Sequence, residues 1–307
     1  MTGGGRSGGA AGDDVPDDAT RDDPGDADRD DRFSDVTDAH VHLMPERLMA
    51  AIRSALHDEA GWSFPDSAAQ ADVERALRAQ GVARYVALPY AHKPGIAREL
   101  NAWLLERAGA SEMAIPFATV HADDEVRAVV RDAFEGGARG LKFQCPVQGC
   151  APDDPRLDPA YELAAEYDRP IVFHAGTAPM FEDSPHVGLD RFRAFVDSYP
   201  EVRACCAHMG TYEHEGFLDL ARERESVFLD TCVAMASTAP DLLDFDPASI
   251  PDAAFEDLAG RIMYGSDYPN VPYAYERERE HLLSRDLSDG AFDALLRGAA
   301  ARFLGER

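Results

Sequence analysis

Short apolar runs alternate with amphipathic stretches along almost the whole chain, and this alternation constrains the fold more than any other feature. Apolar runs predict strands at 36–43, 84–88, 114–120, 140–144, 170–174, 202–208, 227–231 and 262–266. Helical periodicity predicts helices at 69–79, 96–108, 124–135, 159–167, 189–199, 216–224, 240–258, 275–283 and 288–303. Because parallel strands need helical crossovers, the eight strand-helix units predict an α/β fold, a (β/α)8 TIM barrel. A doubly wound open sheet is the alternative.

The first 32 residues differ in composition from the rest of the chain. They carry ten Asp and four Arg among Gly and Ala, with almost no large apolar side chain. Such a segment cannot bury enough surface to offset the entropy of ordering it. We therefore expect a disordered Gly/Asp-rich tail over 1–32 and a single barrel domain over 33–307.

The charge balance excludes several classes of partner. The chain has 57 acidic and 30 basic residues, a formal net charge of −27. Nucleic-acid binding and attachment to an anionic membrane both need clustered basic side chains, so neither is expected. No apolar run approaches the ~20 residues of a membrane-spanning helix, and residues 1–11 lack a secretory pattern. The sequence thus predicts a cytoplasmic protein, whose five cysteines are reduced and include Cys205 and Cys206 as small core residues.

Lysine is almost absent, since only Lys93 and Lys142 occur among 30 basic residues. Together with the acid excess this suggests a halophilic protein, because molar salt screens repulsion between surface carboxylates. A GC-rich genome that favours arginine codons would explain the loss of lysine but leaves the acid excess without a cause.

Histidines fall at the ends of the predicted strands. His40 and His42 are two residues apart in the first strand, so alternation points both side chains to the same face. His174 ends the fifth predicted strand, His208 the sixth, and Asp267 the eighth. Since the carboxyl ends of barrel strands share one rim, we expect these residues to converge there.

Several imidazoles and a carboxylate around one point form a site for Zn²⁺ or a similar divalent ion. Such an ion lowers the pKa of a bound water to about 7 and polarises carbonyl groups. A single strand-end histidine is more often a core residue than a ligand. Four of them at the same end of the predicted strands are hard to explain by packing.

These motifs resemble the amidohydrolase superfamily, in particular the branch related to aminocarboxymuconate semialdehyde decarboxylase. The resemblance runs from about residue 35 to the C-terminus. It rests on DAHVHL at 38–43, GARGLKF at 137–143, YELAAEYDRPIVFHAG at 161–176, AHMG at 207–210 and MYGSDYP at 263–269. It implies a barrel enzyme but specifies no substrate.

The resemblance implies a role for each candidate residue. His40, His42, His174 and Asp267 would bind one divalent ion, for which Zn²⁺ is the expected metal. His208 and Asp267 would be catalytic, with His208 polarising the substrate or activating water and Asp267 shuttling a proton. The residues alone leave open whether His208 is a ligand or a base, because both roles need the same location.

Lys142 lies in the predicted fourth strand, where binuclear relatives carry a carboxylated lysine that bridges two metals. The presence of a lysine at this position in a lysine-poor chain fits such a role. A second metal is expected only if Lys142 is carboxylated. We favour an unmodified lysine that binds a substrate carboxylate or pairs with an acid. TatD-type nucleases carry a glutamate at this place, which argues against DNA hydrolysis here.

Weaker candidates surround the predicted site. Residues 45–64, which include Trp62, resemble an insertion that covers the active site in related proteins; an amphipathic surface helix is the alternative. His121 faces either the substrate or solvent, and His92 and Lys93 are candidates for binding an anionic group. Further candidates for the pocket lining are Thr177, Met180 and Tyr268.

The leading hypothesis is a metal-dependent hydrolase that cleaves a C–N or C–O bond of an amide, lactone or ester in a small organic substrate. The alternative is non-oxidative decarboxylation of an unsaturated or aromatic carboxylic acid at the same site. A third hypothesis is a barrel with a purely structural metal, although closed structural sites usually recruit cysteines. A homodimer is compatible with this kind of protein, and no sequence feature demonstrates it.

Overall fold

Eight parallel strands form the centre of the protein. The computed structural model describes residues 32–306, so the tail predicted over 1–32 lies outside the described residues except for Arg32. The strands are β1 (Val36–His42), β2 (Val82–Leu88), β3 (Ala114–Pro116), β4 (Leu141–Gln144), β5 (Ile171–His174), β6 (Ala204–Cys206), β7 (Val227–Asp230) and β8 (Ile262–Met263). Their hydrogen-bonded order follows the sequence, β1-β2-β3 and β4-β5-β6-β7-β8.

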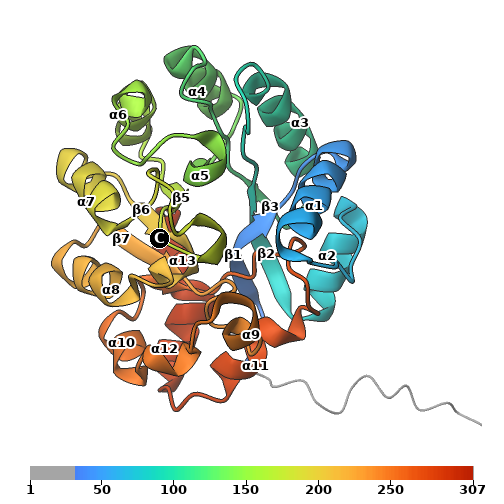
Figure 1. Ribbon diagram of the computed structural model, residues 1–307, viewed down its shortest axis with the longest axis vertical. Helices are drawn as coiled ribbons and strands as arrows, with labels where there is room; N and C mark the ends of the chain where they lie inside the picture. Colours follow the sequence, from blue (N-terminus) through green and yellow to red (C-terminus); the bar gives the residue numbers. More distant parts are fainter. Residues whose placement is uncertain (1–31, 307) are drawn as a thin grey trace, which may run out of the picture. The chain divides into compact units, whose positions relative to one another are not determined.

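Backbone hydrogen bonds join these two groups of strands into a closed barrel. Between β3 and β4, Ala118 N donates to Gly140 O at 2.8 Å, and Lys142 N donates to Ala118 O at 2.8 Å. Between β8 and β1, Ala39 N donates to Tyr264 O at 2.8 Å. Figure 1 shows the strands at the centre with the helices around them. The predicted TIM barrel is confirmed.

Helices form the outer layer because each buries one apolar stripe against the strands. In α4 (Val126–Glu135) the buried residues are Val126, Val129, Val130, Ala133 and Phe134, the spacing of one helical face. The other helices are α1 (Glu46–Ala60), α2 (Gln70–Ala79), α3 (Ala97–Gly109), α5 (Cys145–Gln148), α6 (Asp158–Glu166), α7 (Leu189–Ser198), α8 (His214–Glu223), α9 (Ala239–Leu243), α10 (Asp252–Asp257), α11 (Glu276–Leu283), α12 (Asp289–Asp293) and α13 (Ala299–Phe303). None of these helices is long and apolar enough to cross a membrane.

Two predicted helices are interrupted. The helix expected over 240–258 is wrong as a single element, because Pro247 begins a 3₁₀ turn and Pro251 precedes α10. The helix expected over 288–303 contains a π-helical turn at Ala294–Gly298. Strand β6 also ends earlier than predicted, and His208 lies beyond it in a 3₁₀ turn with a backbone φ of +57°.

The barrel interior is apolar at the end where the strands begin. Phe303 of α13 stacks on Phe117 with ring centroids 6.3 Å apart and packs against Phe228 at 5.2 Å. Val172 and Cys205 belong to the same buried cluster. All five cysteines are buried and free, as the sequence predicts. The interior is therefore sealed by apolar side chains at the end where the strands begin.

Candidate metal centre

Strand β1 places two imidazoles side by side with their tautomers fixed. His42 is the register partner of Leu88 on β2, and its Nδ1 donates to the Leu88 carbonyl oxygen at 2.9 Å. His40 Nδ1 donates to Asp230 Oδ2 at 2.9 Å. A carbonyl can only accept, and a carboxylate accepts when ionised, so both Nδ1 atoms carry the proton. The Nε2 atom of each ring is then unprotonated and carries a lone pair.

Asp267 faces both of these lone pairs. Its backbone N donates to His40 O at 2.8 Å, which holds the residue beside β1 in a left-handed conformation with φ +58°. Its Oδ1 lies 3.0 Å from His42 Nε2 and 3.3 Å from His40 Nε2, and it has no hydrogen-bond donor. Three electron-pair donors thus meet with no proton between them.

A divalent cation resolves this arrangement. Ligand atoms about 2.0–2.2 Å from one ion lie about 3 to 3.4 Å from one another, which is the spacing found here. We call His40, His42 and Asp267 the metal cluster. Their ligand atoms all lie within 4.8 Å of one another. Burial, and then the charge of Lys142, lower the pKa of His40 to about 4, so the ring is neutral as a ligand must be. The residues present fit a metal.

His174 and His208 lie next to the metal cluster and contact each other. His208 Nδ1 is 3.1 Å from the Cys232 carbonyl oxygen, to which it donates, and its Nε2 is 3.0 Å from His174 Nδ1. His174 is the register partner of Gln144 on β4, whose Nε2 lies 3.0 Å from the same Nδ1. His174 Nε2 is buried without a partner. The close grouping does not include His174, and its role as a ligand stays a prediction.

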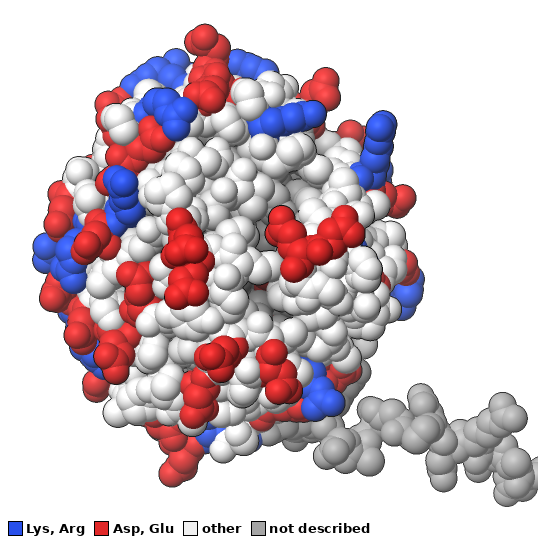
Figure 2. Space-filling model, in the orientation of Figure 1, with Lys and Arg blue, Asp and Glu red and all other residues white. Residues whose placement is uncertain are grey.

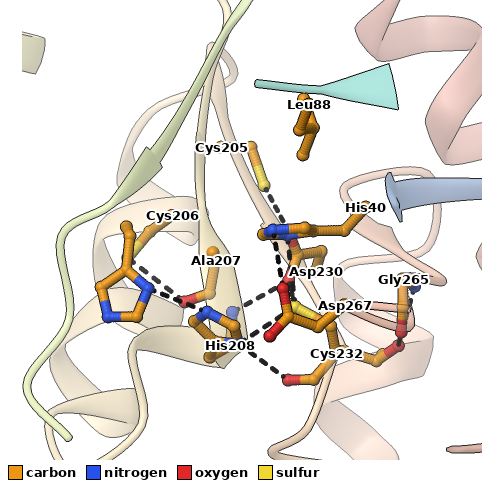
Figure 3. A network of polar contacts seen from close by, with 12 residues as sticks. His40, Leu88, Cys205, Cys206, Ala207, His208, Asp230, Cys232, Gly265 and Asp267 are labelled. Atoms are coloured by element: carbon orange, nitrogen blue, oxygen red, sulfur yellow. Dashed lines mark hydrogen bonds and ion pairs between the residues drawn. The ribbon is translucent and has the colours of Figure 1, made fainter. Parts of the chain in front are cut away.

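Asp230 is a central residue of the site that the sequence reasoning missed. It ends β7 and is fully buried. Its Oδ2 accepts from His40, while its Oδ1 accepts from His208 N at 2.8 Å and from Cys232 Sγ at 2.7 Å. Burial opposes ionisation of Asp230, but its interaction with His40, which includes the hydrogen bond from Nδ1, holds the pKa of Asp230 well below the usual range. Figure 3 shows this carboxylate between His40 and His208. The sequence did contain a signal for Asp230, because this residue, like Asp267, is an acidic residue at the end of a predicted strand.

Lys142 lies inside the barrel beneath the metal cluster. Its side chain is fully buried, and its Nζ is 3.4 Å from His40 Nε2. Burial lowers the pKa of Lys142, and the charges of Asp267 and Asp230 oppose that shift. Lys142 does not line the cavity above the metal cluster. Its carboxylation and its binding of a substrate carboxylate both remain untested predictions.

A cavity of about 700 Å³, measured with its open mouth, lies directly above the metal cluster. Helix α1 contributes Ile52 and Leu56 to its wall, and the segment after it contributes Trp62. Residues 45–64 therefore contain a helix, Glu46–Ala60, and also border the site. Met180 lines the cavity as predicted. The residues proposed for the surroundings that do not line it are His92, Lys93, His121, Thr177 and Tyr268.

Other lining residues were missed by the sequence reasoning. Tyr90 follows β2, is 7% exposed, and packs edge-on against His42 with ring centroids 5.5 Å apart. Gln144 and Asn270 are the neutral amides of the wall. Gln144 ends β4, so the rule that polar residues at strand ends face the site would have found it.

Comparison with known proteins agrees with this architecture. The sequence model of the amidohydrolase family matches residues 37–305, and the chain belongs to that family. No curated protein sequence matches the chain.

Solved structures share the fold. An uncharacterised TIM-barrel protein from Bordetella bronchiseptica is 19% identical with a TM-score of 0.69, covering 88% of this chain and 99% of its own. The 2,6-dihydroxybenzoate decarboxylase from Rhizobium is 15% identical with a TM-score of 0.61, over 89% of this chain and 99% of its own. The 5-carboxyvanillate decarboxylase from Sphingomonas paucimobilis is 14% identical with a TM-score of 0.57, over 90% and 100%.

Proposed function

We propose that this chain is a metal-dependent carboxy-lyase that removes CO₂, without oxidation, from an aromatic or unsaturated carboxylic acid. The observation that carries the proposal is the apolar cavity placed directly on the metal cluster. Similar structures that are decarboxylases, from Sphingomonas paucimobilis and Rhizobium among others, support this reaction over the hydrolysis that led the sequence analysis. The substrate is a small molecule in either case.

His40, His42 and Asp267 would hold one divalent ion, and His174, with its unpartnered Nε2, is the fourth candidate ligand. When bound, the ion supplies positive charge that fixes and polarises a substrate carboxylate. Imidazole and carboxylate ligands suit both Zn²⁺ and Mn²⁺. We propose Zn²⁺ as the ion. Mn²⁺ is the competing ion, because a similar structure, a 5-carboxyvanillate decarboxylase from Novosphingobium aromaticivorans, contains bound manganese.

The cavity wall would bind the organic part of the acid. Ile52, Leu56 and Phe181 offer apolar surface that a flat ring can cover, and they exclude water from it. Loss of neutral CO₂ spreads the charge of a carboxylate over the remaining skeleton. An apolar surrounding favours that change, since it solvates the concentrated charge of the carboxylate less well than water does.

The reaction needs one proton at carbon. When the carbon–carbon bond to the carboxylate breaks, its electron pair stays on the substrate carbon, which then takes up a proton as CO₂ leaves. Asp267 and His208 both line the cavity and are the groups that can hold or pass this proton. Cys232 O orients the His208 ring by accepting from Nδ1, which leaves Nε2 beside Nδ1 of His174, another residue that lines the cavity, at 3.0 Å.

Hydrolysis of an amide, lactone or ester is the second candidate. It is favoured by the same pair, because the Nε2 of His208 and the carboxylate of Asp267 could move the protons of an attacking water.

A paired assay separates the two reactions. Protein reconstituted with Zn²⁺ or Mn²⁺ is offered aromatic and unsaturated acids, with CO₂ release measured, and cyclic amides, lactones and esters, with release of amine, acid or alcohol measured. We expect CO₂ from at least one acid, and loss of that activity in Asp267→Asn. Turnover of the second panel alone would overturn the decarboxylase proposal.

A further inference from the structure

The charge of the cavity lining is unusual for a site that binds an organic acid. Among the described residues that line it, none is Lys or Arg. The polar groups of the wall away from the metal cluster and its neighbouring histidines are neutral: Tyr90, Gln144, Thr211 and Asn270. The wall therefore contains no cation that could pair with an anionic group of the substrate.

Arg53, which contacts the lining residue Asn270, is already engaged. Arg53 on α1 donates to Pro269 O at 2.5 Å, to Asp66 O at 2.7 Å and to Asn270 Oδ1 at 3.3 Å, and its guanidinium packs over Phe64. These bonds orient the Asn270 amide so that its NH₂ group is the part left for a ligand. Arg53 does not line the cavity, and what it contributes there is a fixed neutral donor, the NH₂ group of Asn270.

The buried charges below the cavity limit what the site can neutralise. Asp230 and Asp267 are carboxylates, and Lys142, the only Lys or Arg among the buried residues that the structure describes, contacts His40 and does not line the cavity. The other buried carboxyl groups, Asp38 and Glu278, could only add negative charge if they ionised. None of these buried groups therefore offers a cation to a second substrate carboxylate.

The entrance adds negative charge. The cavity opens into a vestibule that shares Trp62, Met180 and Leu243 with it and that also contains Glu59 and Asp241. Figure 2 shows acidic side chains near the centre of this face, whereas the basic side chains lie toward its edge. This arrangement repels a second anionic group on an incoming ligand.

We infer that the site selects acids with a single carboxylate on an otherwise uncharged ring or chain, and that it rejects dicarboxylates. The inference rests on the proposed function for the carboxylate at the metal, and it names the substrate class. A second carboxylate would be buried against Ile52, Leu56 and Phe181 with no partner, which costs far more than any contact it could make.

Two ligands of equal shape test the inference. 3-Nitrobenzoate and isophthalate both place a planar two-oxygen group beside a benzoate carboxylate, but only isophthalate carries a second charge. Binding of each to the Zn²⁺- or Mn²⁺-loaded protein is measured by calorimetric titration, which needs no turnover. We expect isophthalate to bind at least about 30-fold more weakly.

Substitution of the wall provides the matched control. Val147 and Met180 line the cavity and are 39% and 37% exposed, so a longer side chain there leaves the core intact. Val147→Arg should supply the missing cation and reduce the ratio to below about threefold, while Val147→Met should keep the wild-type ratio. Met180→Arg repeats the test from another segment if Val147→Arg does not fold.

The outcomes separate this inference from the proposed function. Equal or tighter binding of isophthalate by the wild-type protein, or no binding of either anion, overturns the charge selectivity. An unchanged ratio in both arginine variants overturns it as well. If the ratio holds but no acid of the assay panel releases CO₂, the decarboxylase proposal fails while the preference for a single carboxylate stands.

Discussion

The metal cluster together with Asp230, which we call the floor, and the mainly apolar lining of the cavity above it, which we call the wall, are built in opposite ways. On the floor, each of His40, His42 and Asp230 has its side chain fixed by a hydrogen bond to another element of the barrel, and all are buried. On the wall, apolar side chains such as Val147 of the short helix α5 and Met180 of a 3₁₀ turn are partly exposed. The difference indicates that the metal chemistry is rigidly specified, whereas ligand selection depends on few and replaceable contacts.

Removal of two floor ligands should have the largest effect. The His40→Ala/His42→Ala variant loses two of the three donors of the metal cluster, so we expect no retained metal and a fall in kcat/KM of at least about a thousandfold. Elemental analysis after dialysis measures the metal, with one equivalent expected in the wild type. The wall variant Val147→Ala should retain that equivalent. Two equivalents in the wild type would instead support a carboxylated Lys142.

Asp230→Asn tests whether the floor depends on a residue outside the metal cluster. The variant removes the carboxylate that accepts from His40 and His208, and loss of such a partner lowers metal affinity about 10- to 100-fold. Competition with a chromophoric chelator measures the affinity. Cys205→Ala is the control, because its Sγ makes only a 3.7 Å contact with Asp230. Unchanged affinity in Asp230→Asn would mean that the floor is less coupled than its hydrogen bonds indicate.

Trp62→Ala tests the independence of the wall. The indole lines both the cavity and the vestibule, so its loss should raise KM roughly tenfold through lost apolar contact. We expect metal content and kcat to stay close to those of the wild type, measured by elemental analysis and steady-state kinetics. A variant that loses its metal would show that floor and wall are not separate.

Salt should act on the surface and leave the floor alone. With a formal net charge of −27, the protein gains stability when surface repulsion is screened, and we expect its Tm to rise by several degrees between dilute buffer and molar KCl. Metal stoichiometry should be the same in both. An equal Tm in the two solutions would refute the halophilic interpretation of the sequence.

The barrel and most of the site were predictable because they depend on local patterns. Alternation of apolar runs located every strand, and the strand-end rule placed His40, His42, His208 and Asp267 at one end of the barrel, where the structure brings them together. His174 was located correctly at the end of β5, but its distance from the metal cluster depends on side-chain packing that a sequence pattern does not encode.

The remaining features depend on contacts between distant segments. Asp230 is recognisable as a strand-end acid, but its partners His40 and His208 are 190 and 22 residues away in the sequence. The absence of Arg53 from the cavity wall depends on its bond to the carbonyl oxygen of Pro269, which is 216 residues away. No local pattern reports that an arginine is already engaged.

The seam between β8 and β1 gives the candidate ion a mechanical role. Strand β8 is only two residues long, and beyond it the seam depends on Asp38, which accepts from Ser266 N and Oγ, and on the Asp267 N to His40 O bond. An ion bound by His40 and His42 of β1 and by Asp267 after β8 would cross-link the first and last strands of the barrel. Chelation should then speed hydrogen exchange of the amides along this seam, so that the first strand to separate from the barrel is the one that carries the histidine pair.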